Sequence, residues 1–153
     1  MSQPKPFQFR VYPEKRGGQY YNCLIFPSRK AMLLYDDFQR EKLKMPKRER
    51  GEEHAAQVRY WTTLKTDARG RFSHKGRSLG EIHFYRNKMR VGIVAHEAAH
   101  ATLFYARANK VKASSLLHAK NPDHEHLCWV LGNINRQIWL GHARQSSSAR
   151  RTK

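Results

Sequence analysis

The sequence predicts a single α+β domain in which a short antiparallel sheet packs on two buried helices. Residues 7–11 alternate apolar and polar side chains, and residues 20–26 are rich in β-forming residues, so both segments are expected to be strands. Residues 91–108 are apolar around almost their whole circumference as far as Phe104, a pattern typical of a helix buried on most sides. A second strong helix is predicted to begin at Pro122 and to stop at Gly141.

The first half of the chain supplies the remaining elements. Ser28 is a good N-cap for an amphipathic helix that fades near Met45. Residues 54–64 are predicted to form another helix, and residues 67–80, which are Gly-rich and basic, a loop. Residues 81–86 alternate as a strand does. The residues of the 54–64 helix expected to face inward are Val58, Trp61 and Leu64.

Charge is the most unusual feature of the composition. Among 153 residues, 30 Lys and Arg oppose 12 Asp and Glu, which gives a formal charge of +18. Such a charge predicts an anionic partner, and nucleic acid, a membrane surface and an acidic protein all remain open. One domain is expected over residues 1–144, followed by a basic, disordered tail over residues 145–153.

Other features restrict the cellular setting. No apolar run approaches the roughly 18–20 residues that span a bilayer, and the N-terminus lacks the apolar stretch of a secretory signal. The two cysteines, Cys23 and Cys128, are too few for a disulfide framework, and neither lies in a CxxC pair. We therefore expect a reducing, cytoplasmic setting without membrane insertion.

An HExxH motif, His96-Glu97-Ala98-Ala99-His100, lies within the first apolar helix. Residues i and i+4 share one helical face, so both imidazoles can bind one zinc ion, and Glu97 can take a proton from a metal-bound water. A chance match somewhere in a chain of this composition has a probability of roughly three in a hundred. A structural alternative is that both histidines bond to buried carbonyls and Glu97 pairs with an arginine.

A catalytic zinc site needs a third protein ligand. The start of the next helix offers Glu125 as the first candidate and His124 as the second, whereas His118 and His126 are expected to lie at the surface or to support a ligand without binding the metal. Strand 81–86 precedes the motif helix, and as an edge strand it could pair with an extended peptide; an ordinary sheet strand is the alternative. The candidates for stabilising an oxyanion are His83, Tyr85, Tyr105 and His142.

Two blocks of sequence, Ile93 to Ala101 and Glu125 to Gly132, carry a family resemblance. Together with the expected order of elements, they resemble the small gluzincin-like zincin metallopeptidases of phages and mobile elements, including the ImmA/IrrE type. That resemblance implies zinc held by His96, His100 and Glu125, with Glu97 as the general base. It also implies a zincin-like fold, a peptide or protein substrate, and the host cytoplasm if the gene is carried by a phage.

A second resemblance is to the SprT/Spartan-type proteases, which cleave DNA-bound proteins and use a histidine as third ligand. His124 is the nearest equivalent in this chain, and the basic charge agrees with that similarity. A rival interpretation is a basic nucleic-acid-binding protein with a structural or vestigial zinc site, which the basic segments 40–50 and 145–153 favour. A hydrolase of non-peptide amides is a third hypothesis.

Overall fold

The structure of the chain is a computed structural model. The residues that it describes are 5–15, 18–46, 56–59, 64–66, 72–74, 76–112 and 122–151. Their helices and strands, in chain order, are β1 (Phe7–Val11), β2 (Tyr20–Phe26), α1 (Arg29–Lys42), β3 (Ala56–Arg59), β4 (Leu64–Thr66), β5 (Phe72–His74), β6 (Ser78–Tyr85), a 3-10 turn (Arg86–Lys88), α2 (Val91–Ala108) and α3 (Pro122–Arg151).

The main sheet has four strands in the order β1-β2-β6-β3, and the α+β class is therefore confirmed. The sheet is mixed, because β2 and β6 run parallel while the two outer pairs are antiparallel. The prediction of an antiparallel sheet was wrong at this pair. Parallel neighbours need a long crossover, and the segment between β2 and β6 includes α1 and β3. Strands β4 and β5 form a separate antiparallel pair.

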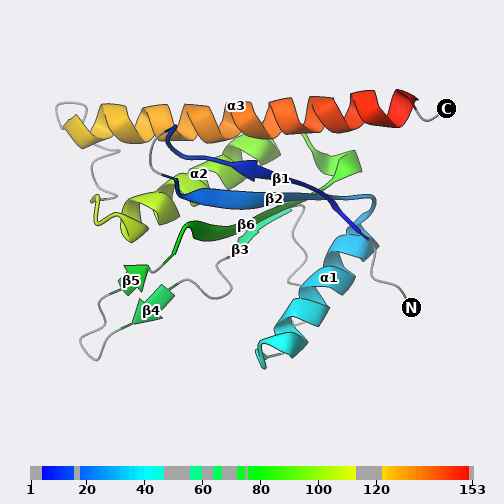
Figure 1. The fold of residues 1–153 in the computed structure, drawn as a ribbon, viewed down its shortest axis with the longest axis horizontal. Helices are drawn as coiled ribbons and strands as arrows, with labels where there is room; N and C mark the ends of the chain where they lie inside the picture. Colours follow the sequence, from blue (N-terminus) through cyan, green and yellow to red (C-terminus); the bar gives the residue numbers. More distant parts are fainter. Residues whose placement is uncertain are drawn as a thin grey trace.

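Helices cover both faces of the sheet (Figure 1). Successive side chains of a strand point to opposite faces, so Cys23 and its partner Ile82 lie on one face, and Leu24 and its partner His83 on the other. The first face contributes to the large core shared with α2 and α3, whereas Leu24 belongs to a smaller core that includes residues of α1. The three layers are therefore α1, the sheet, and the pair α2 and α3.

Helix α2 has the predicted bounds, but it is not buried on most sides. Its buried residues include Val94, Glu97 and Ala101, while Val91 is 72% exposed and Leu103 is 40% exposed. The apolar composition did not indicate that one face of the helix is exposed, because alanine and glycine occur on both faces.

The region between residues 54 and 80 differs most from prediction. A helix over 54–64 was wrong, because Ala56–Arg59 pairs with β6 as strand β3 and Leu64–Thr66 forms β4. The expected loop over 67–80 contains β5, and β6 begins at Ser78. The predicted core residue Trp61 lies outside the described residues.

Helix α3 continues ten residues past its predicted stop, as far as Arg151. Gly141 does not end the helix; a Cβ atom there would overlap the ring of Phe9, so glycine permits β1 to approach the helix backbone. Residues 145–151, for which we predicted a disordered tail, belong to this helix, and Gln145 is buried. The predicted domain boundary at residue 144 therefore falls inside a helix.

The predicted first helix is confirmed. Ser28 is its N-cap, and the Ser28 hydroxyl accepts a hydrogen bond of 3.2 Å from the Ala31 amide. Among the described residues, no helix combines the length and the apolar character needed to cross a membrane.

Candidate active site

The two histidines of the HExxH motif lie together on the exposed face of α2. Their Nε2 atoms are 3.0 Å apart, and their rings are nearly perpendicular, with centroids 4.6 Å apart. One helical turn separates residues i and i+4, which explains why both rings extend from the same face. Because both His side chains are exposed, Glu97 is the one motif residue among the three whose burial removes a polar group from water.

Glu97 is 5% exposed. Burial raises the pKa of its carboxyl group, and the neighbouring His96 offsets part of this rise. A carboxylate with a raised pKa is a stronger base than one in water, which is the property required of a group that takes a proton near neutral pH.

A pocket of about 230 Å³ brings the motif and strand β3 together. It is lined by four consecutive strand residues and three helix residues, namely Ala56, Gln57, Val58, Arg59, His96, Glu97 and His100. In the described sheet, β3 is the outer strand, whereas β6 is paired on both sides. Of the two interpretations of strand 81–86, the ordinary sheet strand is therefore confirmed, and the edge beside the motif belongs to β3.

The two imidazoles share a hydrogen bond of 3.0 Å, and this separation can be compared with that of two ligands of one ion. Zinc–nitrogen bonds of roughly 2.0–2.1 Å at a tetrahedral angle would hold two nitrogens about 3.3 Å apart. The Nε2 separation of 3.0 Å is close to this value. His96 and His100 therefore fit a zinc ion at the wall of the pocket.

The candidates for the third ligand lie on another element. Glu125 is in the first turn of α3, where it is exposed, and it does not line the pocket. The Nε2 atom of His124 is 3.7 Å from the thiol of Cys128, one turn further along the same helix. Within the described ranges, no three His, Cys, Asp or Glu side chains are grouped as a metal site would require. The other candidate considered, His118, lies outside the described residues.

His126, which we expected to be a surface group, joins three elements. Its Nε2 atom is 2.9 Å from a carboxylate oxygen of Glu14, in the segment after β1. The hydroxyl of Tyr105, on α2, donates a 2.5 Å hydrogen bond to the same carboxylate oxygen. Burial, followed by this hydrogen bond and the charge of Glu14, raises the pKa of Tyr105. This contact holds the N-terminal segment against both long helices.

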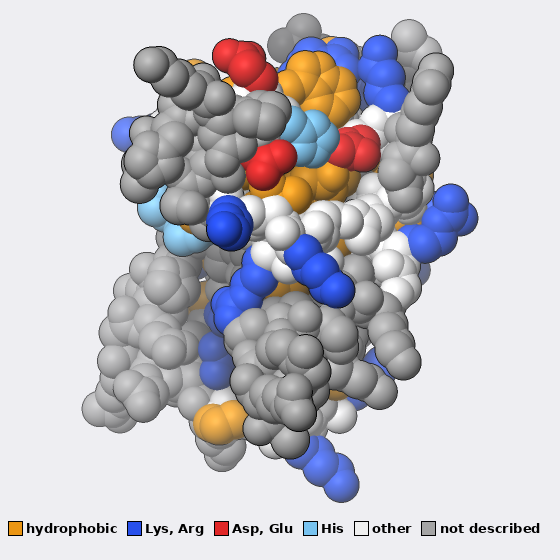
Figure 2. Space-filling model, turned by 90° about the vertical axis from the view of Figure 1, so that its left-hand side faces the viewer, with side chains coloured by type: hydrophobic (Ala, Val, Ile, Leu, Met, Phe, Trp, Pro, Cys, Tyr) orange, Lys and Arg blue, Asp and Glu red, His pale blue; other side chains and the backbone are white. Residues whose placement is uncertain are grey.

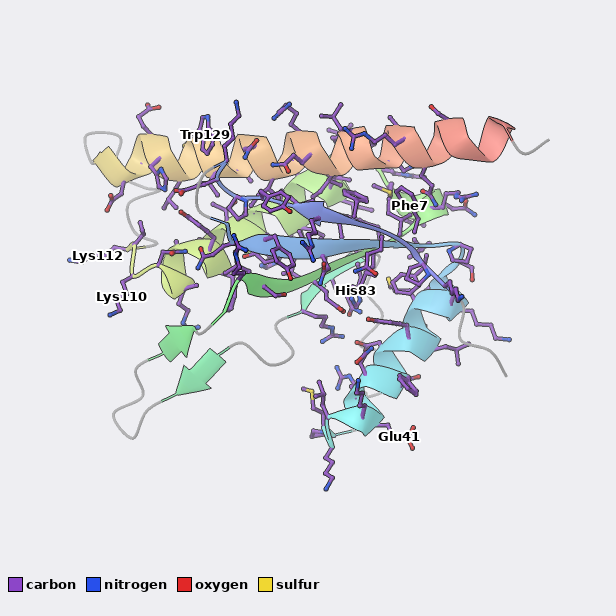
Figure 3. All side chains as sticks on the ribbon, viewed as in Figure 1. Phe7, Glu41, His83, Lys110, Lys112 and Trp129 are labelled. Atoms are coloured by element: carbon purple, nitrogen blue, oxygen red, sulfur yellow. The ribbon has the colours of Figure 1, made fainter. Side chains whose placement is uncertain are left out.

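The four candidates for an oxyanion donor all lie away from the pocket lining. His83 is fully buried beneath the sheet (Figure 3), between Phe26 and Tyr35 of the α1 layer. Tyr85 packs in that same small core. Tyr105 is bonded to Glu14, and His142 stacks edge-on against Trp139.

A buried polar network behind the pocket could not be anticipated from the motif. Asp36 of α1 is fully buried and is bonded to Arg59 at 3.2 Å and to Arg40 at 3.3 Å. Gln57 lies 3.5 Å from Asp36 and 3.1 Å from the Nδ1 atom of His83. The network therefore attaches β3, whose residues line the pocket, to α1.

The same network extends along β6. The Nε2 atom of His83 is 2.8 Å from Glu81, which also accepts a hydrogen bond of 3.1 Å from the Tyr35 hydroxyl. Burial, and then the charge of Glu81, raises the pKa of Tyr35. A sequence signal for the network exists in retrospect, since Asp36 falls among the apolar positions on the inner face of α1.

No protein-family model, curated protein or solved structure matches the chain.

Proposed function

We propose that the chain is a small zinc metallopeptidase with a zincin-like fold. The observation that supports this most strongly is the arrangement around one pocket of two imidazoles 3.0 Å apart, a buried glutamate and the outer strand of a sheet. An extended peptide can bind by pairing with a strand edge, and hydrolysis of its amide is promoted by a base and an electrophile.

His96, His100 and a third ligand would hold the ion. We propose Glu125 for the third position, with His124 as the alternative, on the resemblance to gluzincin-like enzymes. Zinc bound there would activate a water molecule and polarise the substrate carbonyl.

Glu97 would act as the general base. Its carboxylate accepts the proton of the attacking water at an oxygen atom and then delivers that proton to the leaving amine. Burial helps both steps, because it brings the pKa of this group nearer to neutrality.

Strand β3 would bind the substrate backbone. Its four residues line the pocket, and it is the outer strand of the described sheet. The side chains of Gln57 and Arg59 bond to Asp36 on the α1 side of the sheet, so β3 would contribute its backbone to this pocket.

The test combines metal content with cleavage of a mixture of unstructured peptides, analysed by mass spectrometry. We expect one zinc per wild-type chain and peptide cleavage that a chelator abolishes. Glu97→Gln should keep the zinc and lose cleavage by at least about 100-fold, the scale of general-base catalysis. His96→Ala and His100→Ala should lose both.

The matched control is Glu41→Gln, an exposed residue near the end of α1, which should leave both readouts unchanged. A wild-type protein that binds no stoichiometric zinc would refute the proposal. Cleavage that survives in Glu97→Gln would refute the assigned base.

A further inference from the structure

A second concave surface lies on α3 and is not lined by any residue of the HExxH pocket. It is lined by Lys15, Trp129, Gly132, Asn133 and Arg136, and it encloses about 300 Å³. Trp129 is 47% exposed and lies on the side of α3 that faces away from the sheet (Figure 3). We call these five residues the α3 groove.

Helix Gly132 has no packing reason to be glycine. A Cβ atom at this position would meet nothing within 4 Å, in contrast to Gly141. Glycine inside a helix costs about 1 kcal/mol relative to alanine. Glycine at position 132 therefore does not stabilise the fold. Because it has no side chain, the floor of the groove between Trp129 and Arg136 stays open.

Hydrogen bonds hold the cationic walls of the groove in place. Asn133 donates bonds of 2.9 Å to the carbonyl oxygens of Tyr12 and Pro13, which attaches the segment carrying Lys15 to α3. The Oδ1 atom of Asn133 accepts a bond of 3.3 Å from Arg136. The acidic neighbour of Lys15, Glu14, is bonded to Tyr105 and His126 instead.

Acidic side chains gather where α3 begins. Figure 2 shows Asp and Glu side chains gathered around a histidine on the face where α3 begins, whereas Lys and Arg are scattered over the rest of that face. Asp123 and Glu125 are in the first turn of α3, and the positive end of the helix dipole favours acids there. Between Trp129 and residue 147, the part of α3 whose exposure is described, the exposed ionic residues are Arg136 and Arg144.

We propose that the α3 groove binds single-stranded nucleic acid, with a base stacked on Trp129 and the phosphates paired with Lys15 and Arg136. An exposed indole beside two cations matches a ligand that alternates flat rings with negative charges. The charge of +18 adds a long-range attraction to such a polyanion. This proposal is independent of the zinc site and of peptide hydrolysis.

The test measures the fluorescence anisotropy of a labelled twelve-nucleotide single strand over a range of salt concentrations, with full-length protein. Trp129→Ala should weaken binding by roughly 5- to 150-fold, the range found for loss of one stacked base. Arg136→Ala should weaken binding and lower the salt slope by about one. Lys42→Ala, at the end of α1, removes the same charge from another layer and should leave the slope nearly unchanged.

Two further arms separate stacking from charge and from folding. Inorganic polyphosphate should bind Trp129→Ala as well as wild type, because it has no bases, but should bind Arg136→Ala more weakly. Gly132→Leu should fill the groove and weaken oligonucleotide binding at least fivefold while the protein remains as stable as wild type. If position 132 had only a structural role, Gly132→Leu would not weaken oligonucleotide binding while the stability of the protein stays unchanged.

Several results would overturn the proposal. One is equal oligonucleotide affinity for wild type, Trp129→Ala and Gly132→Leu. Another is an equal loss of oligonucleotide affinity in Lys42→Ala and Arg136→Ala, which would show that the overall positive charge binds the strand without a specific site. Tighter binding of a duplex than of the single strand, unaffected by Trp129→Ala, would assign the charge to double-stranded nucleic acid bound elsewhere.

Discussion

Two glycines of α3 are expected to respond in opposite directions to the same substitution. At Gly141, an added Cβ would overlap three atoms of the Phe9 ring, which forces either the ring or the helix to move. Overpacking of this kind costs about 1–3 kcal/mol, and so extensive an overlap places the cost at the upper end. Alanine recovers about 1 kcal/mol of helix propensity. The net destabilisation by Gly141→Ala is therefore about 2 kcal/mol.

Gly132→Ala is the matched control, because it makes the same chemical change in the same helix at a position with open space around it. It should stabilise the protein by up to about 1 kcal/mol. At roughly 2–4 °C per kcal/mol for a chain of this size, Gly141→Ala should lower Tm by about 4–8 °C and Gly132→Ala should raise it by about 2–4 °C.

Urea unfolding followed by circular dichroism would measure both changes. The cause is tested by repeating Gly141→Ala in a Phe9→Ala background, where the obstructing ring is absent and the substitution should no longer destabilise. An unchanged or raised stability of Gly141→Ala in the wild-type background would refute the packing of β1 on the α3 backbone.

Three further predictions concern buried groups. Asp36→Asn should cost about 3 kcal/mol in urea unfolding, because it leaves two arginines without their buried carboxylate, whereas Asp37→Asn on the exposed side should change stability by less than about 0.5 kcal/mol. Burial raises the pKa of Tyr105, so the contribution of its neutral hydroxyl to the free energy of unfolding is complete below the unfolded pKa of about 10 and is lost as the pH rises further. Stability should therefore decline less steeply at alkaline pH in Tyr105→Phe than in the wild type. An identical decline in both proteins would contradict the assignment. A thiol reagent should modify Cys128 in the native protein and Cys23 only after unfolding, since burial raises the pKa of Cys23; two fast thiols would contradict the buried position.

Local signals in the sequence predicted the elements that depend on local physics. The strand at 20–26, the helix after Ser28 and the helix over 91–108 all have the expected bounds, because alternation, capping and long apolar periodicity act within one segment. The prediction of a helix over residues 54–64 was wrong for the opposite reason. Its pairing with β6 is a contact across the sheet that periodicity does not report.

Tertiary contacts also explain the error at Gly141. A glycine near the end of an apolar stripe usually marks a helix C-terminus. Here the glycine serves a close approach to Phe9, a residue far away in the sequence, and the helix continues.

For the candidate site, spacing alone predicted that His96 and His100 share a face, and the structure confirms that juxtaposition. Gln57 and Arg59 were missed, because their place beside the motif depends on strand order. The assignments of Glu125 as ligand and Glu97 as base stay predictions.

Zinc K-edge X-ray absorption of the zinc-loaded protein tests the central claim most directly. The account predicts nitrogen and oxygen neighbours at about 2.0–2.2 Å with an imidazole signature that disappears in His96→Ala and His100→Ala and persists in Cys128→Ser. A sulfur neighbour near 2.3 Å that disappears in Cys128→Ser would place the ion at the His124–Cys128 pair instead, and would contradict a zinc site built on the HExxH motif.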